Sequence, residues 1–305
     1  MKQYVVLLLW LIAIVPSAYA QSCCATGAGS NWSILPNINK HTVGVRYTYR
    51  SSYSIYPSSL NPEMNGRRTD EHMHTAEVFG RFKLHKRLQL SVYLPVNIIQ
   101  QNEAGTFSKS AGLGDMMFLL QGMLLNPDKC YKGNSRHQLR VGAGLKLPSG
   151  QFKMDQKYMF TTNMQLGSGS LDVLFNAIYT YRFKQFGFNL LSSYKLNTYN
   201  PQQFKFGDKL QGGGNFFYVF KVKESGVQLM PTLGLYCDHN FSNRKNKDVL
   251  GYTGGTFVTT SAGLDLYYKR FALSASVIPT VLNKLNWSGE MKQKYAVEAG
   301  VYYNF

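Results

Sequence analysis

The last eleven residues of the chain, 295–305, alternate between two kinds of side chain with a period of two. One set is Tyr295, Val297, Ala299, Val301, Tyr303 and Phe305, and the other is Ala296, Glu298, Gly300, Tyr302 and Asn304. Successive side chains of a β-strand point to opposite faces, so the pattern predicts a strand with one apolar face and one polar face. An edge strand of a soluble sandwich could look the same, but a strand between lipid and a polar lumen requires this alternation.

The same period recurs in eleven other segments, so the alternation is a property of the whole chain. The predicted strands are 41–51, 74–85, 87–98, 113–126, 136–148, 169–183, 186–196, 210–222, 227–238, 257–268, 271–282 and 295–305. Each is long enough for a tilted strand to cross the hydrocarbon layer of a membrane.

Long and short connections alternate between these segments. Minimal connections, such as Lys86-Arg87 and Lys184-Gln185, are followed by long ones, such as 99–110 and 197–209. Short periplasmic turns and long outer loops are typical of bacterial outer-membrane barrels, and an even strand number puts both termini in the periplasm. We therefore predict an all-β fold, a transmembrane antiparallel up-and-down β-barrel of about 12 strands over residues 41–305 with both termini periplasmic. Side chains alone would not fill a barrel of this size, so we expect a narrow water-containing lumen.

The amino terminus predicts export. Lys2 precedes an apolar run from Val5 to Val15, and small residues lead to a cleavage point at Ala20. This is the organisation of a signal peptide, which we place at residues 1–20. The predicted location after cleavage near Ala20 is the bacterial outer membrane. The terminal Phe305 also resembles the signal by which outer-membrane proteins are recognised for insertion.

Residues 21–40 are small, polar and rich in glycine, and we expect a periplasmic or lumen-entering extension there. Cys23 and Cys24 lie within it. They could be free thiols, partners for another chain, soft-metal ligands or, for Cys23, a lipidation site. The four cysteines of the chain are too few and too irregularly spaced for a disulfide framework.

Composition agrees with a barrel. No stretch after the signal peptide is apolar enough for a membrane-spanning helix, mean hydropathy is −0.22, and aromatic residues make up 14% of the chain. The formal net charge of +17 would suit nucleic acid, but an exported chain seldom meets any, so we expect no nucleic-acid partner. The scattered basic residues fit lumen and loop positions that face anionic lipopolysaccharide or anionic solutes, with membrane lipid around the barrel.

Charged side chains recur on the polar faces of the predicted strands, and we expect them to line the lumen. The set is Arg46, Arg50, Glu77, Arg81, Asp115, Arg140, Lys146, Asp172, Arg182, Asp265 and Glu298. Charges in a partly desolvated lumen are costly alone, so most should pair across it as a structural ladder. We predict that Glu298 meets Arg46 or Arg50 between the last strand and the first. Because cations exceed anions, a continuous pore would favour anionic or neutral polar solutes.

Catalytic and metal sites are not predicted. The stretch Gly167-Ser-Gly-Ser170 lacks the spacing of a serine nucleophile elbow, so no catalytic residue, enzyme activity or cofactor is assigned. The residues nearest to a metal set are Cys23, Cys24, His72 and His74.

Three motifs carry a family resemblance: Gly112-Leu-Gly-Asp115, Leu147-Pro-Ser-Gly150 and Gln165-Leu-Gly-Ser-Gly-Ser-Leu-Asp172. They resemble the outer-membrane transporter-like family associated with meta-pathway phenol degradation. The cysteine-containing stretch from Cys23 to Ser30 resembles the Bacteroidota version of that barrel. The resemblance implies passage of small, often hydrophobic molecules and carries no catalytic motif.

The predicted function is therefore an outer-membrane β-barrel transporter or channel for small solutes, hydrophobic or aromatic ones included. The alternative is a non-transporting structural or partner-binding barrel linked to metal or redox handling, in which residues 21–36 recruit a periplasmic protein.

Overall fold

The computed structural model describes residues 41–55, 68–103, 105–125, 135–152, 164–222, 226–251, 253–285 and 291–305. The predicted signal peptide and the extension at 21–40, with Cys23 and Cys24, lie outside the described residues. Within the described ranges, no helix is long and apolar enough to cross a membrane.

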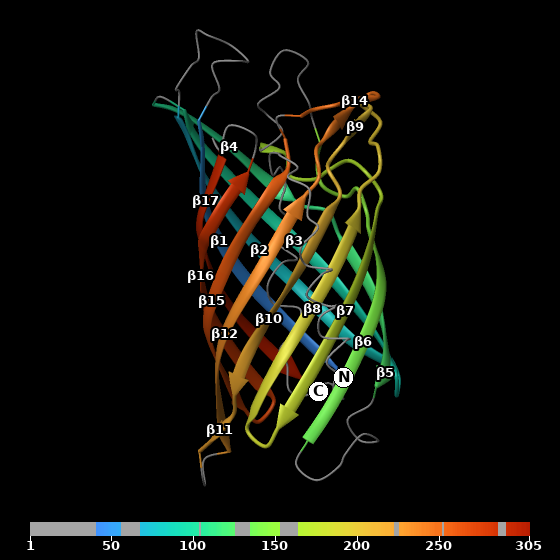
Figure 1. Ribbon diagram of the computed structural model, residues 1–305, viewed down its shortest axis with the longest axis vertical. Helices are drawn as coiled ribbons and strands as arrows, with labels where there is room; N and C mark the ends of the chain where they lie inside the picture. The colour runs from blue at the N-terminus through green and yellow to red at the C-terminus, as the bar shows by residue number, and fades with distance from the viewer. Residues whose placement is uncertain are drawn as a thin grey trace, which may run out of the picture.

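The described chain forms one large antiparallel sheet that closes into a barrel (Figure 1). Its strands are β1 (Thr42–Ile55), β2 (Arg68–His85), β3 (Leu88–Glu103), β4 (Thr106–Leu113), β5 (Met117–Leu125), β6 (Ser135–Lys146), β7 (Asp172–Phe183), β8 (Phe186–Leu196), β10 (Lys209–Tyr218), β11 (Phe220–Lys221), β12 (Val227–Asn240), β15 (Gly255–Tyr268), β16 (Phe271–Leu285) and β17 (Met291–Asn304). Because β4 continues into β5 and β10 into β11, these strands fill twelve positions around the wall. A small second sheet joins β9 (Phe204–Lys205), β13 (Arg244–Lys245) and β14 (Asp248–Val249).

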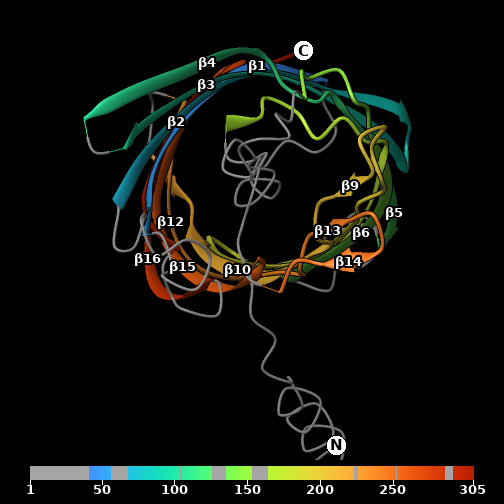
Figure 2. The same ribbon diagram turned by 90° about the horizontal axis from the view of Figure 1, so that it is seen from above.

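The last strand closes the barrel against the first. Pairing of β17 with β1 runs from Thr42↔Asn304 to Ser54↔Met291, and β10 pairs with both β8 and β12. The predicted twelve-strand up-and-down barrel, and its closure through the terminal strand, are therefore confirmed. Figure 2 shows the resulting ring from above.

The two rims of the barrel differ. Two-residue turns at 86–87, 184–185 and 269–270 join strands at one rim, which we call the turn end. Lys184 and Lys269 adopt the left-handed conformation there, with φ of 53° and 52°, as tight hairpin turns require. β1 begins and β17 ends at this rim. The opposite rim, the loop end, carries the longer connections and the small β9–β13–β14 sheet.

Outward aromatic side chains gather at two levels of the wall, which we call the turn-end belt and the loop-end belt. At the turn end, His41 stacks on Phe305 with ring centroids 5.4 Å apart. Toward the loop end, Tyr47 and Tyr49 pair through their hydroxyl groups with Nδ1 of His74 and His72, each at 2.7 Å. Aromatic girdles flank the apolar band of outer-membrane barrels, and these positions fit them.

The wall departs from the sequence prediction beyond the loop-end belt. Residues 99–110 were expected to form a loop, and this was wrong: β3 continues to Glu103 and pairs with β4 from Glu103↔Thr106 to Val96↔Leu113. Gly105, with φ of +89°, makes the turn. Most side chains of β4 are exposed whichever face they point to, so this strand lacks the alternation by which the other strands were predicted.

The inner face is less polar than expected. Inward apolar and aromatic side chains pack into a buried cluster, mostly in the half of the barrel nearer the turn end. It comprises Phe79, Tyr93, Leu119, Leu174, Ile178, Leu191, Phe217, Val219, Met230, Tyr236, Tyr267, Ala272 and Tyr302. The interior of the described barrel is therefore a mixture of charged and apolar surfaces.

Candidate functional site

The fourth wall position is interrupted, and the interruption sends a carboxylate into the barrel. β4 ends at Leu113 and β5 begins at Met117. Between them, the backbone N–H of Gly114 donates to the carbonyl of Pro95 at 2.8 Å, and Asp115 is 2% exposed. The prediction of one continuous strand over 113–126 is therefore wrong for residues 114–116, which lie between β4 and β5.

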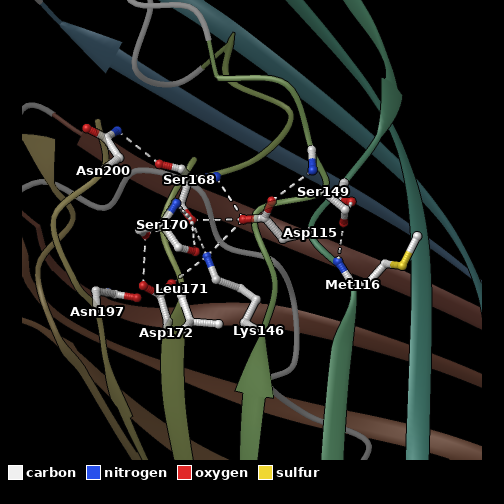
Figure 3. A network of polar contacts seen from close by, with 12 residues as sticks. Asp115, Met116, Lys146, Ser149, Ser168, Ser170, Leu171, Asp172, Asn197 and Asn200 are labelled. Carbon is white, nitrogen blue, oxygen red and sulfur yellow. Dashed lines mark hydrogen bonds and ion pairs between the residues drawn. The ribbon is translucent and has the colours of Figure 1, made fainter. Parts of the chain in front are cut away.

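Asp115 ties three chain segments together (Figure 3). Its Oδ1 accepts from the N–H of Gly150 at 3.0 Å, and its Oδ2 accepts from the N–H of Ser168 at 2.7 Å and from Nζ of Lys146 at 2.9 Å. The Ser168 hydroxyl donates to the same Oδ2 at 2.9 Å. One carboxylate thus fixes the segments that leave β6 and lead into β7.

Lys146, the last residue of β6, joins Asp115 to Asp172, the first residue of β7. Its Nζ lies 2.5 Å from Oδ2 of Asp172 and also donates to Oγ of Ser168. Oδ1 of Asp172 accepts from the Ser170 hydroxyl at 2.8 Å and from the N–H of Thr198 at 3.0 Å. The segment after β8 is thereby attached to the same group of residues, which we call the Asp115–Lys146–Asp172 network.

The network is buried and carries one cation and two anions. The side chains of Lys146, Asp115 and Asp172 are 5%, 0% and 0% exposed. The backbone N–H and hydroxyl donors offset the second negative charge, which is the condition under which buried ion pairs are tolerated.

Two glycines allow the segments to cross at contact distance. A side chain at Gly167 would place its Cβ 2.3 Å from Oδ1 of Asp115 and 2.8 Å from Cα of Gly150. Even alanine therefore does not fit at position 167 without displacing the network.

The segment before β7 lies inside the ring (Figure 2). Leu166 is 5% exposed, and its carbonyl accepts from Nδ2 of Asn97, an inward residue of β3, at 3.2 Å. Phe204 and Phe206, which follow β8, pack on Phe152, with ring centroids 6.1 and 5.8 Å from that of Phe152. The inward segments before β7 and after β8 therefore narrow the lumen at the loop end. The Asp115–Lys146–Asp172 network anchors both segments to the wall.

The bonding within the network suits a structural role better than catalysis. An ammonium group has three protons, and Nζ of Lys146 contacts three acceptors, on Asp115, Asp172 and Ser168, so no lone pair remains to activate the Ser168 hydroxyl. Within the described chain, His, Cys, Asp and Glu do not gather in groups of three or more suited to a metal. His72 and His74 instead bond to the tyrosines of the loop-end belt.

Most of the remaining predicted lumen residues lie closer to the turn end or midway along the wall, whereas Arg50 of β1 lies level with the loop-end belt. Arg46 pairs with Glu77 at 2.5 Å, and Glu298 acts electrostatically on both Arg46 and Arg50. The Arg182 Nε donates to the carbonyl of Lys184 at the turn-end rim at 2.9 Å. The structure therefore brings Asp115, Lys146 and Asp172 together at one end, and leaves the other predicted residues outside that network.

A small cavity lies in the turn half of the barrel. Its volume is about 40 Å³, room for roughly three water molecules. Its lining includes Arg46, Arg81 and Asp265 beside the rings of Tyr93 and Tyr302.

Sequence reasoning missed the partners of the three charged residues. Ser168, Ser170 and the glycines Gly150 and Gly167 stand in the motifs that carry the family resemblance, but no role was assigned to them. The positions of the three motifs could have revealed these roles. The motifs lie just before β5, just after β6 and just before β7, and three neighbouring antiparallel strands place these ends at one rim.

Comparisons with known proteins agree on the architecture. No protein-family model and no curated protein matches the chain. Among solved structures, it is similar to an outer membrane channel from Pseudomonas putida F1, with a TM-score of 0.63 and 13% identity over 90% of this chain and 98% of that one. The β domain of the Bordetella autotransporter BrkA gives a TM-score of 0.49, with 11% identity over 87% and 99%. At 13% identity the likeness to the Pseudomonas channel concerns the fold alone, and the chain has the fold of an outer-membrane β-barrel.

Proposed function

We propose that the protein is an outer-membrane channel for small solutes whose passage is narrowed at the loop end by inward segments. The observation that carries the proposal is the Asp115–Lys146–Asp172 network, which fastens the segments after β6, before β7 and after β8 to the inside of the wall. A barrel that served only as a membrane anchor would not need three connections folded onto its inner face.

Two considerations support small hydrophobic or aromatic molecules as the solutes. The inward cluster around Phe79, Tyr93 and Tyr302 gives the lumen an apolar surface, which suits small hydrophobic or aromatic molecules. The resemblance to the family associated with meta-pathway phenol degradation, in its Bacteroidota form, points to the same class.

The proposed orientation puts the turn end in the periplasm and the loop end outside the cell. This places the amino-terminal segment on the periplasmic side after signal-peptide cleavage near Ala20, and it places the loop end among lipopolysaccharide. Short periplasmic turns are the basis for this orientation.

Liposome swelling tests the channel directly. Proteoliposomes of purified, heat-modifiable barrel should swell in small neutral solutes faster than empty liposomes. Folded barrel that admits neither small solutes nor salt would count strongly against the proposal.

The second candidate is a non-transporting, partner-binding barrel linked to metal or redox handling. Its support is that inward side chains such as Leu119 and Ile178 are fully buried, as in a packed interior. Deletion of residues 21–36 separates the two functions: gain of solute flux favours a channel, whereas loss of a co-purifying periplasmic protein with no flux favours the binder.

A further inference from the structure

The outer face of the wall carries a group of basic side chains just beyond the loop-end belt. Cζ of Arg68 on β2 lies 4.4 Å from the ring centroid of Tyr53 on β1, and Nζ of Lys294 on β17 lies 5.3 Å from it. Tyr53 follows Tyr49 of the belt by four residues, so its side chain points to the same outward face. Because an aromatic face attracts cations, the ring of Tyr53 holds both of them on the outside of the barrel.

Asp70 holds the same two cations together. Its Oδ2 accepts from Nε of Arg68 at 3.0 Å, and its Oδ1 accepts from Nη2 of Arg68 at 2.8 Å and from Nζ of Lys294 at 3.2 Å. A guanidinium has five N–H donors and an ammonium has three, so Asp70 uses only part of this capacity. The Arg68 and Lys294 side chains are 51% and 36% exposed, so donors remain for an acceptor from outside the chain.

Two further lysines extend the positive charge along the rim. Lys292 of β17 lies opposite Tyr53 in the β1–β17 register, so the two side chains share the outward face. Lys284 of β16 precedes Leu285, which is buried with Phe257 on the inner face, so its own side chain points outward. Both lysines are exposed.

These side chains form one surface, which we call the basic patch: Tyr53, Arg68, Asp70, Lys284, Lys292 and Lys294. Its four cations and single carboxylate leave a formal net charge of +3. Such a concentration of one sign attracts an anionic partner.

The level of the basic patch matches a lipid headgroup. A strand rises about 3.3 Å per residue, so Tyr53 lies roughly 13 Å along β1 beyond Tyr49. Aromatic belts mark the edge of the hydrocarbon layer, so this distance puts the patch beside headgroups and not beside acyl chains. In the proposed orientation the loop end is outside the cell, where the lipid is lipopolysaccharide. Its membrane anchor, lipid A, is an acylated disaccharide that carries phosphate groups.

Phosphate is the acceptor that suits this donor set. Arginine binds phosphate oxygens through its planar fork, and groups of Lys and Arg at the membrane surface recognise anionic headgroups. The Tyr53 ring and the Asp70 carboxylate already position Arg68 and Lys294, so less side-chain freedom is lost on binding.

We propose that the basic patch binds a phosphate group of lipid A, with the phosphate at Arg68, Lys292 and Lys294. The acyl chains then lie along the apolar outer face near Val297, which is 37% exposed. The assignment rests on the proposed orientation of the barrel, because it needs the loop end in the outer leaflet. It does not depend on solute passage through the lumen.

Lipid binding to the detergent-purified barrel tests the site. The probes are diphosphoryl lipid A and the same lipid A with both phosphates removed, and bound lipid is measured by native mass spectrometry. We expect the wild-type barrel to bind the phosphorylated form about tenfold or more tightly. The triple variant Arg68→Gln/Lys292→Gln/Lys294→Gln should lose that preference.

The matched control removes the same number of cations from the other rim. Lys86→Gln/Arg87→Gln/Lys269→Gln changes one arginine and two lysines, all exposed at two-residue turns of the turn end, and should keep the wild-type preference. Heat-modifiable migration shows whether each variant is folded. If the loop-end triple variant does not fold, Lys292→Glu reverses one exposed charge and should still weaken binding of phosphorylated lipid A several-fold.

Equal binding of phosphorylated lipid A by the wild type and the loop-end triple variant would overturn the site. Loss of the preference in the turn-end control would overturn it as well, since overall charge or the opposite orientation would then explain binding. Displacement of lipid A by an equal concentration of inorganic phosphate would refute the lipid assignment. A barrel that prefers phosphorylated lipid A but passes no solute would support the patch and refute the channel, whereas solute flux without that preference would refute the patch alone.

Discussion

Asp115 and Lys146 meet at 2.9 Å, although one lies in the interruption between two strands and the other ends a strand on the neighbouring wall position. The contact requires the break between β4 and β5, because the break lets Asp115 turn inward toward the end of β6. It links the irregular part of the wall to the loop-end narrowing.

The first prediction concerns stability. Lys146→Met leaves the carboxylates of Asp115 and Asp172 buried without a cation, and removing one partner of a buried pair costs about 3–5 kcal/mol. The free energy of unfolding, followed in urea by the shift from folded to unfolded gel migration, should fall accordingly. Lys294→Met is the control, because its pair with Asp70 is far more exposed and worth about 1 kcal/mol or less. Equal losses in the two variants would mean that the network is not the anchor described.

The sequence predicted the wall well and the network poorly. The strand predicted at 136–148, observed as β6, was evident because Leu139, Val141 and Leu145 alternate with inward polar or glycine positions, and that alternation is local. The meeting of Asp115 with Lys146 and Asp172 depends on a strand break and on folded connections, which are non-local. The inward Leu174 and Ile178 were overlooked because a polar lumen was assumed.

A second prediction tests which part of the wall lies in lipid. Val45, 52% exposed, points outward midway between the two aromatic belts, and arginine at a bilayer midplane costs about 2–4 kcal/mol. Val45→Arg should therefore reduce insertion into lipid vesicles, measured by heat-modifiable migration. Phe107→Arg changes a similarly exposed residue of β4, beyond the loop-end belt, and should insert normally. Equal insertion of both variants would place the membrane elsewhere on the barrel.

The β3–β4 hairpin provides a third prediction. Gly105 has a positive φ that a β-branched residue adopts only with strain, so Gly105→Val should loosen the hairpin. Amide hydrogen exchange should accelerate in β4 and in the end of β3, while the unfolding midpoint of the barrel stays unchanged. A fall in that midpoint equal to the one caused by Lys146→Met would show that the hairpin is part of the cooperative wall.

The most direct test of the channel account is the conductance of Gly167→Ala in planar bilayers. A Cβ at position 167 would collide with Asp115 and Gly150, whereas Gly212→Ala adds a Cβ with nothing within 4 Å. We predict that Gly167→Ala conducts several-fold more than wild type, because its inward segments are displaced, and that Gly212→Ala matches wild type. Folded wild-type and Gly167→Ala barrels that are equally silent would contradict a lumen gated by the Asp115–Lys146–Asp172 network.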